Sequence, residues 1–227
     1  MTSFPMRRAR RHAQSGFTLV EIAIVLVIIG LLLGGVLKGQ ELIENGRVKN
    51  AANDMNGISA AYNSYLDRYR RLPGDDGPNL AALTARGGSW ANITAFGNNN
   101  GIVASTAANT FTGGDESTAF FQHLRAAGFI TGNPADAGAN APPVNAWGGR
   151  VGIVNVINIQ GRTVARLLVC LGNVPGKAAA ALDIQLDDGN PAQGSFRATA
   201  GPNNVAPGAA PAAYNEDQTY TVCRDLA

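Results

Sequence analysis

One carboxylate lies inside a long apolar stretch near the start of this 227-residue chain. The stretch runs from Phe17 to Leu37, and Glu21 is its only charged residue. A helix of that length, rising about 1.5 Å per residue, covers the roughly 30 Å hydrocarbon core of a bilayer. A carboxylate at that depth costs about 2.5 kcal/mol or more, so it indicates a function and needs a partner. No lysine or arginine in the stretch can supply one.

Side chains suited to catalysis are scarce elsewhere. Only two histidines occur: His12 precedes the apolar stretch, and we expect His123 to be a surface or core-edge residue of a short helix. The chain has no Gly-x-Ser-x-Gly sequence, phosphate loop or zinc-ligand spacing. We therefore expect a protein that is not an enzyme and that has no cofactor and no metal.

The charges before the apolar stretch differ from those after it. The formal charge of +2 includes four arginines near the amino terminus: Arg7, Arg8, Arg10 and Arg11. Without them, 14 of the 18 basic residues remain against 16 acidic ones, which gives a charge of −2 and favours no nucleic-acid contact. By the positive-inside rule the arginines stay in the cytoplasm, and the chain after Leu37 crosses the membrane.

The junction before the apolar stretch is distinctive. Gly16-Phe17-Thr18-Leu19-Val20-Glu21, followed by the apolar run, resembles the class III leader junction of type IV prepilins and type II secretion pseudopilins. The resemblance implies that a prepilin peptidase cleaves between Gly16 and Phe17 and methylates the new amino group of Phe17. It also implies that Glu21 is needed for filament assembly.

The physics of the span agrees with this role for Glu21. The ammonium of Phe17 on a neighbouring subunit could pair with the Glu21 carboxylate where neither charge is solvated. The alternative is an ordinary signal peptide or anchor in which Glu21 is incidental. A secretory signal places its small residues after an apolar core of about 7 to 15 residues, whereas Gly16 precedes a longer run.

We divide the chain into four regions. They are a leader over residues 1–16, the transmembrane half of a long helix over 17–37, its amphipathic half over 38–71, and an extracytoplasmic head over 72–227. The predicted fold class is α+β, with the long N-terminal helix packed on an antiparallel β-sheet head, which is pilin-like.

The long helix is predicted from periodicity. Apolar residues recur every three or four positions from Val48 to Tyr69, and no proline occurs before Pro73. We expect the tyrosines of this stripe to pack in the core. Four glycines, Gly30, Gly34, Gly35 and Gly39, could let helices of neighbouring subunits approach closely or could make the span flexible.

The head is expected to mix loops, helices and strands. We predict a loop region over 72–114, a helix capped by Asp115-Glu116-Ser117-Thr118 and ended by Gly128, and an antiparallel hairpin of strands 151–159 and 163–171. We also predict a helix over 177–186, strands over 195–199 and 218–223, and an exposed loop over 201–213.

Both cysteines, Cys170 and Cys223, belong to the exported part, where a disulfide can form and persist. We expect them to pair, to stabilise the head by about 4 kcal/mol on the chain-entropy model, and to tether the 201–213 loop. Clusters of acidic and amide residues, such as Asp75-Asp76 and Asp187-Asp188, could bind calcium. They lack a calcium-loop spacing, however, and are typical of solvated turns.

These observations favour a structural subunit that polymerises into a filament. The first interpretation is a type IV pilin, major or minor, because the cysteine pair resembles the disulfide-closed region of pilins. The second is a type II secretion pseudopilin, and an alternative of another class is a membrane-anchored extracytoplasmic binding or hydrolytic domain. The expected partners are further copies of the chain, related pilins, the prepilin peptidase, an assembly platform and membrane lipid. The expected location is the inner membrane, followed by a surface pilus or a periplasmic pseudopilus.

Overall fold

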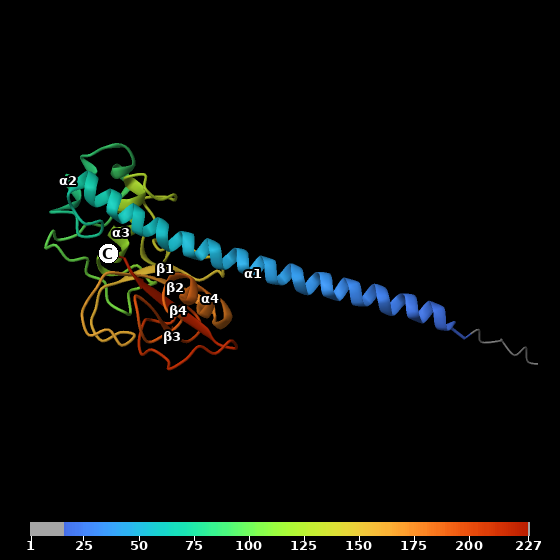
Figure 1. Cartoon of the computed structure of the whole chain (residues 1–227). Helices are drawn as coiled ribbons and strands as arrows, with labels where there is room; N and C mark the ends of the chain where they lie inside the picture. Colours follow the sequence, from blue (N-terminus) through green and yellow to red (C-terminus); the bar gives the residue numbers. More distant parts are fainter. Residues whose placement is uncertain (1–15, 227) are drawn as a thin grey trace, which may run out of the picture. The chain divides into compact units, whose positions relative to one another are not determined.

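The computed structural model describes residues 16–226 (Figure 1). The leader arginines and His12 lie outside the described residues, and so does Ser15. The chain forms two compact units, of which the first ends at Ile43 and the second, the head unit, begins at Glu44. The predicted boundary between the two halves of the long helix, at Leu37, stays a prediction.

The first element is one long helix, α1, from Leu19 to Tyr69. Its bounds agree with the predicted helix over 17–71 to within two residues at each end. Arg70 has a φ of 55°, so the backbone turns into the left-handed region and leaves the helix before Pro73. An 18-residue window of α1 has a mean hydropathy of 2.8, and among the described helices α1 alone is long and apolar enough to cross a membrane.

A stripe along α1 forms one side of the head core. Its buried members recur at helical spacing and are Val48, Ala51, Ala52, Met55, Ile58, Ala61, Tyr62 and Tyr65. The predicted core role of the tyrosines is therefore confirmed. Burial begins only at Val48, so residues 38–47 of the predicted amphipathic half bury no side chain.

Four antiparallel strands form the sheet of the head unit. They are β1 (Val151–Val154), β2 (Leu168–Pro175), β3 (Phe196–Ala200) and β4 (Thr219–Asp225), in the order β1-β2-β4-β3. Apolar side chains from β1, β2 and β4 share the core with the α1 stripe. The architecture is thus the predicted α+β arrangement of a long helix and an antiparallel sheet (Figure 1).

Both edges of the sheet are covered. At β1 the Val151 N–H donates to the Pro143 carbonyl, and at β3 the Ala198 N–H donates to the Pro191 carbonyl. The Ser105 hydroxyl also donates to the Ile153 carbonyl, 2.8 Å away. Covered edges present few free backbone groups to another strand, which protects the head from edge-to-edge aggregation.

The predicted hairpin is only partly correct. β1 pairs with β2 in antiparallel register from Val151–Leu171 to Val154–Leu168, but residues 155–167 between them are irregular. Asn158 and Gln160 have left-handed φ angles of 62° and 50°, which a regular strand does not accommodate. The β-branched composition therefore predicted the pairing but overestimated the strand lengths.

The observed bounds of two helices in the head unit agree with the predicted bounds. α4 spans Gly176–Leu186, and α3 spans Asp115–Ala126 and ends before Gly128, whose φ is 79°. The predicted side-chain cap of α3 is wrong, because its N-cap is Gly114, which has no side chain to accept the free N–H groups of the first turn. The Glu116 carboxylate instead accepts the backbone N–H groups of Asn98 and Ala104.

The predicted loop over 72–114 contains two short helices that the sequence analysis missed. α2 spans Leu80–Thr84, where the Asn79 side chain accepts the Ala82 N–H at 2.9 Å as an N-cap. The 3-10 helix η1 spans Gly88–Asn92, and a second one, η2, covers Gly138–Asn140. Leu83 of α2 and Trp90 of η1 are buried in the core.

Buried carboxylates hold this region in place. Asp75 is 3% exposed and accepts the N–H groups of Asn100 and Gly101 at 3.0 and 2.7 Å. Asp76, which is also buried, accepts the Tyr65 hydroxyl at 2.6 Å and the Arg86 guanidinium at 2.9 Å. The expectation that Asp75 and Asp76 form a solvated turn is therefore wrong, because backbone and side-chain donors replace water at both carboxylates.

His123 joins the same region from α3. The Gly74 N–H donates to Nδ1 at 3.0 Å, and Nε2 lies 3.3 Å from the Ala95 carbonyl. A neutral ring with its proton on Nε2 satisfies both contacts. The side chain is fully buried, so the expectation of a surface or core-edge residue is wrong. Burial lowers the pKa of His123 to about 4, although Asp76 opposes the shift.

Asp76→Ala should destabilise the head by about 2 to 4 kcal/mol, because it leaves the buried Tyr65 hydroxyl and the partly buried Arg86 without their acceptor. Thermal unfolding of the full-length chain in detergent measures the change. Asp67→Ala is the matched control, since Asp67 is an exposed residue of α1. Equal melting temperatures for the two variants would contradict the role of Asp76.

The stability of the head should also depend on pH through His123. Between about pH 6.5, the ordinary pKa of an unfolded histidine, and about pH 4, the unfolded chain binds a proton that the folded chain does not. Stability should therefore fall as the pH falls through this window, by about 3 kcal/mol in total. Unfolding measured against pH for wild type and His123→Asn tests this, since the variant should lack that part of the decline. Parallel pH profiles would refute it.

Candidate processing and assembly site

Thr18 and Glu21 form a capping box at the start of α1. The Glu21 Oε2 atom accepts the Thr18 N–H and the Thr18 hydroxyl, each at 2.8 Å, and the Glu21 N–H lies 3.3 Å from the Thr18 hydroxyl oxygen. These contacts satisfy backbone donors that have no partner within a helix. Glu21 therefore has hydrogen-bond donors inside its own subunit, while the expectation that its charge finds no cation there stays a prediction.

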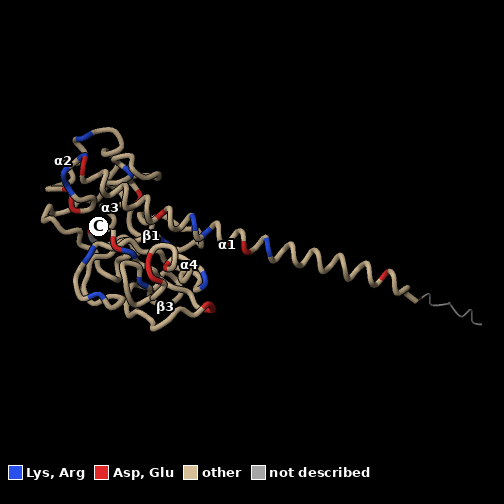
Figure 2. Tube along the Cα trace, in the orientation of Figure 1, with Lys and Arg blue, Asp and Glu red and all other residues tan. Residues whose placement is uncertain are grey.

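The carboxylate keeps capacity for another donor. The hydrogen bonds of the capping box use Oε2 alone, and an ionised carboxylate offers about four acceptor positions on two oxygens. Between Glu21 and Lys38 the chain has no charged residue, and Figure 2 accordingly shows a long tan stretch of α1. Within the described residues, a full positive charge for Glu21 must therefore come from another molecule or from a new amino terminus.

Gly16 and Phe17 lie just before the helix. Both are exposed, and an ideal Cβ built on Gly16 meets nothing within 4 Å. Phe17 is 84% exposed. The peptide bond between them is thus outside regular structure and open to a peptidase, whereas cleavage and methylation there remain predictions.

The glycines of the span lie on an uninterrupted helix. A Cβ built on Gly30, Gly34, Gly35 or Gly39 meets nothing within 4 Å, so no contact inside the subunit requires these glycines. Two roles of these glycines stay predictions: close packing of neighbouring spans, and flexibility of the helix.

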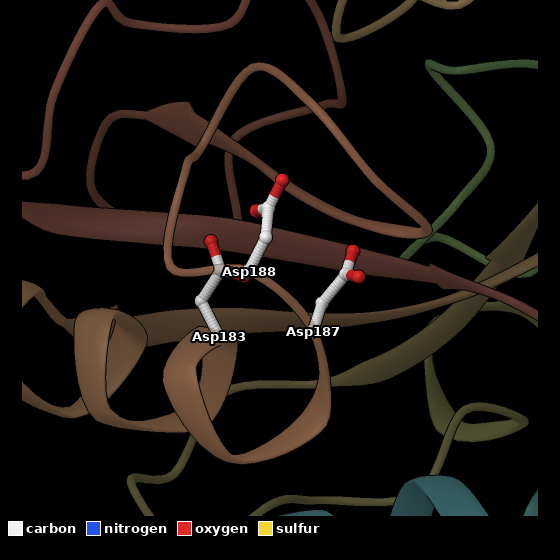
Figure 3. A group of neighbouring side chains, drawn as sticks. All are labelled: Asp183, Asp187 and Asp188. Carbon is white, nitrogen blue, oxygen red and sulfur yellow. The ribbon is translucent and has the colours of Figure 1, made fainter.

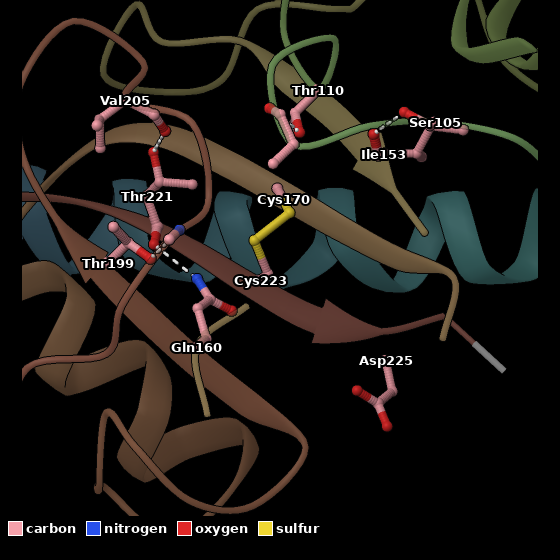
Figure 4. The surroundings of a disulfide bond; sticks show 12 residues. Ser105, Thr110, Ile153, Gln160, Cys170, Thr199, Val205, Thr221, Cys223 and Asp225 are labelled. Carbon is pink, nitrogen blue, oxygen red and sulfur yellow. Dashed lines mark hydrogen bonds between the residues drawn. A yellow bond between two sulfur atoms is a disulfide. The ribbon is translucent and has the colours of Figure 1, made fainter. Parts of the chain in front are cut away.

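Cys170 and Cys223 form the predicted disulfide. They are directly opposite each other on β2 and β4, with Cα atoms 4.1 Å apart, and both are fully buried (Figure 4). The bond therefore cross-links the two central strands of the sheet. The expectation that it tethers the 201–213 loop is wrong. The Thr221 hydroxyl holds that loop by donating to the Val205 carbonyl at 2.6 Å.

Three carboxylates gather at the C-terminal end of α4: Asp183, Asp187 and Asp188 (Figure 3). Their oxygens lie within 4.8 Å of one another. Asp183 accepts the Tyr214 hydroxyl at 2.7 Å and the Gly189 N–H at 3.0 Å, while Asp187 accepts the Phe196 N–H at 2.8 Å. Protein donors thus occupy these oxygens and link α4 to β3 and to the loop before β4.

One residue of the site was missed by the sequence analysis. Thr18 and Glu21 have the Thr-x-x-Glu spacing of a capping box directly before an apolar run. That spacing is the signal that could have identified Thr18 as the partner of Glu21.

Comparison with known families agrees with the geometry. Residues 11–37 match the model of the prokaryotic N-terminal methylation motif. That motif is the class III signal of type IV pilins and pseudopilins, and it implies processing by a prepilin peptidase and polymerisation with other pilins. A comparison with curated proteins finds no match.

Replacement of Glu21 should block assembly without affecting the head. Glu21→Val should reduce surface filaments at least tenfold, because the apolar span then lacks its only charge, while the protein remains in the membrane with its disulfide formed. Glu21→Gln can still accept the Thr18 donors but lacks the charge, so it should restore little. Immunoblots of filament and membrane fractions measure both, with Val20→Ala as the control.

Normal filaments from Glu21→Val would show that the carboxylate is not the assembly contact. Loss of the protein from the membrane fraction as well would place its role in insertion or stability.

Proposed function

We propose that this chain, which carries the class III signal of type IV pilins and pseudopilins, is a structural subunit of a type IV pilus, major or minor. In this proposal a prepilin peptidase cleaves after Gly16 and methylates Phe17. The leader stays in the cytoplasm, α1 holds the subunit in the inner membrane, and the head is extracytoplasmic. An assembly platform then moves the subunits into a surface filament.

The observation that carries the proposal is the Glu21 carboxylate, five residues after the cleavage position in an otherwise uncharged span. The capping box with Thr18 uses the hydrogen-bonding capacity of this costly group but leaves its charge without a cation, which an assembly contact would supply. A non-catalytic role is supported by His123, the one described histidine, which is buried, engaged by two backbone groups and held neutral by its lowered pKa.

The proposal favours a pilin over a type II secretion pseudopilin. This preference rests on the buried disulfide between β2 and β4, which resembles the disulfide-closed region of pilins. A pseudopilin would instead assemble in the periplasm and drive protein export, and a membrane-anchored binding domain would not assemble at all.

Intact mass of filament-derived protein tests the proposal. Filaments sheared from cells should contain this chain without residues 1–16, with one added methyl group on Phe17 and with the two cysteines oxidised. A different amino terminus would contradict the processing assignment. Absence of the chain from surface filaments, combined with a secretion defect on deletion, would favour the pseudopilin.

A further inference from the structure

A groove of about 370 Å³ lies beside α1 in the head unit. Its walls combine α1 residues with segments that follow α3, including Asp54, Gly57, Ile58, Phe129, Ile130 and Val144. Val144 is 60% exposed and Ile58 is buried, so the groove runs from an apolar floor to an apolar rim. Every lining residue belongs to the head unit.

Asp54 is the only ionisable residue that lines this groove. No ion pair joins its carboxylate to a basic side chain among the residues that the structure describes. Neighbouring groups partly desolvate it, which raises the pKa of Asp54. Asp75, Asp76 and Asp183 all bind donors inside the head, so Asp54 differs from them in facing outward without a cation.

Gly57 lies about one turn along α1 from Asp54 and also lines the groove. It is exposed, and an ideal Cβ at this position meets nothing within 4 Å. Packing inside the head therefore does not require glycine here. A glycine inside a helix costs up to about 1 kcal/mol relative to alanine, and its missing side chain leaves room for a group from outside.

The groove suits a side chain with an apolar stem and a cationic end. Lysine and arginine bury their methylene stems on apolar surface while the charged group finds a partner. The head carries such side chains itself: Lys49 and Lys177 are exposed, and neither joins an ion pair with a described residue. A contact between a groove and a different patch on the next copy is heterologous, and it repeats along a helical filament.

We propose that this groove receives a lysine or arginine side chain from the head of a second copy of the chain, with Asp54 as its ionic partner. This head-to-head contact rests on the proposed function as a filament subunit. It adds to the contact at Glu21, because the groove lies in the head and Glu21 in the span.

Filament yield from variants of the full-length chain tests the proposal. Gly57→Leu fills the groove with an apolar side chain, and Asp54→Lys places a like charge where the cation should bind. Each should lower sheared surface filaments at least tenfold while the membrane pool keeps its wild-type amount and melting temperature. Asn63→Leu and Asn63→Lys are the matched controls, because Asn63 is an exposed α1 residue outside the groove. Both controls should assemble normally.

Normal filaments from Gly57→Leu and Asp54→Lys would overturn the groove contact while the proposed pilus function stands. Loss of the Gly57→Leu protein from the membrane pool would also overturn it, since position 57 would then be needed for folding. If the wild-type chain forms no filaments in the same cells, the proposed function itself fails.

Discussion

A charge that water cannot reach needs a partner, and Glu21 is the residue of this chain for which that constraint is strictest. In the single subunit the constraint is met locally, because Thr18 supplies an N–H and a hydroxyl to the carboxylate. These dipolar donors stabilise the charge but do not neutralise it. Neutralisation requires a cation, and the amino terminus created next to Thr18 by cleavage would be the nearest new one on each subunit.

The head obeys the same rule with different donors. Asp75 and Glu116 each accept backbone N–H groups from the 97–104 segment, and Asp76 accepts a tyrosine and an arginine. Burying a carboxylate without donors costs free energy. Each of these hydrogen-bonded pairs therefore fixes the course of the backbone around it. An irregular region is thereby fixed against α1 and α3 without long strands.

Periodic features and the disulfide were predictable from the sequence, whereas the burial of polar side chains was not. The apolar run, the 3.6-residue period and the absence of proline before Pro73 located the ends of α1 to within two residues. All four strands were predicted, the first two from β-branched runs. The burial of Asp75, Asp76 and His123 was missed, because clusters of Asp, Asn and Gly have the same composition in a solvated turn and in a buried one. Their donors come from residues 10 to 49 positions away, which no local pattern reveals.

The assembly site was predictable in its residues but not in its geometry. Gly16, Phe17 and Glu21 follow from the junction sequence, and residues 11–37 match the methylation motif. The capping role of Thr18 was overlooked because Glu21 was considered only as a partner for a neighbouring subunit. The groove at Asp54 has no sequence signature, since its walls come from α1 and from segments more than 70 residues further along the chain.

The most direct test of the central claim is a helical reconstruction, by electron cryomicroscopy, of filaments sheared from cells. We expect the amino group of Phe17 on one subunit to lie within hydrogen-bonding distance, about 3 Å, of the Glu21 carboxylate on its neighbour. A filament in which Glu21 faces lipid or solvent, with Phe17 remote from the carboxylate of every neighbour, would contradict it.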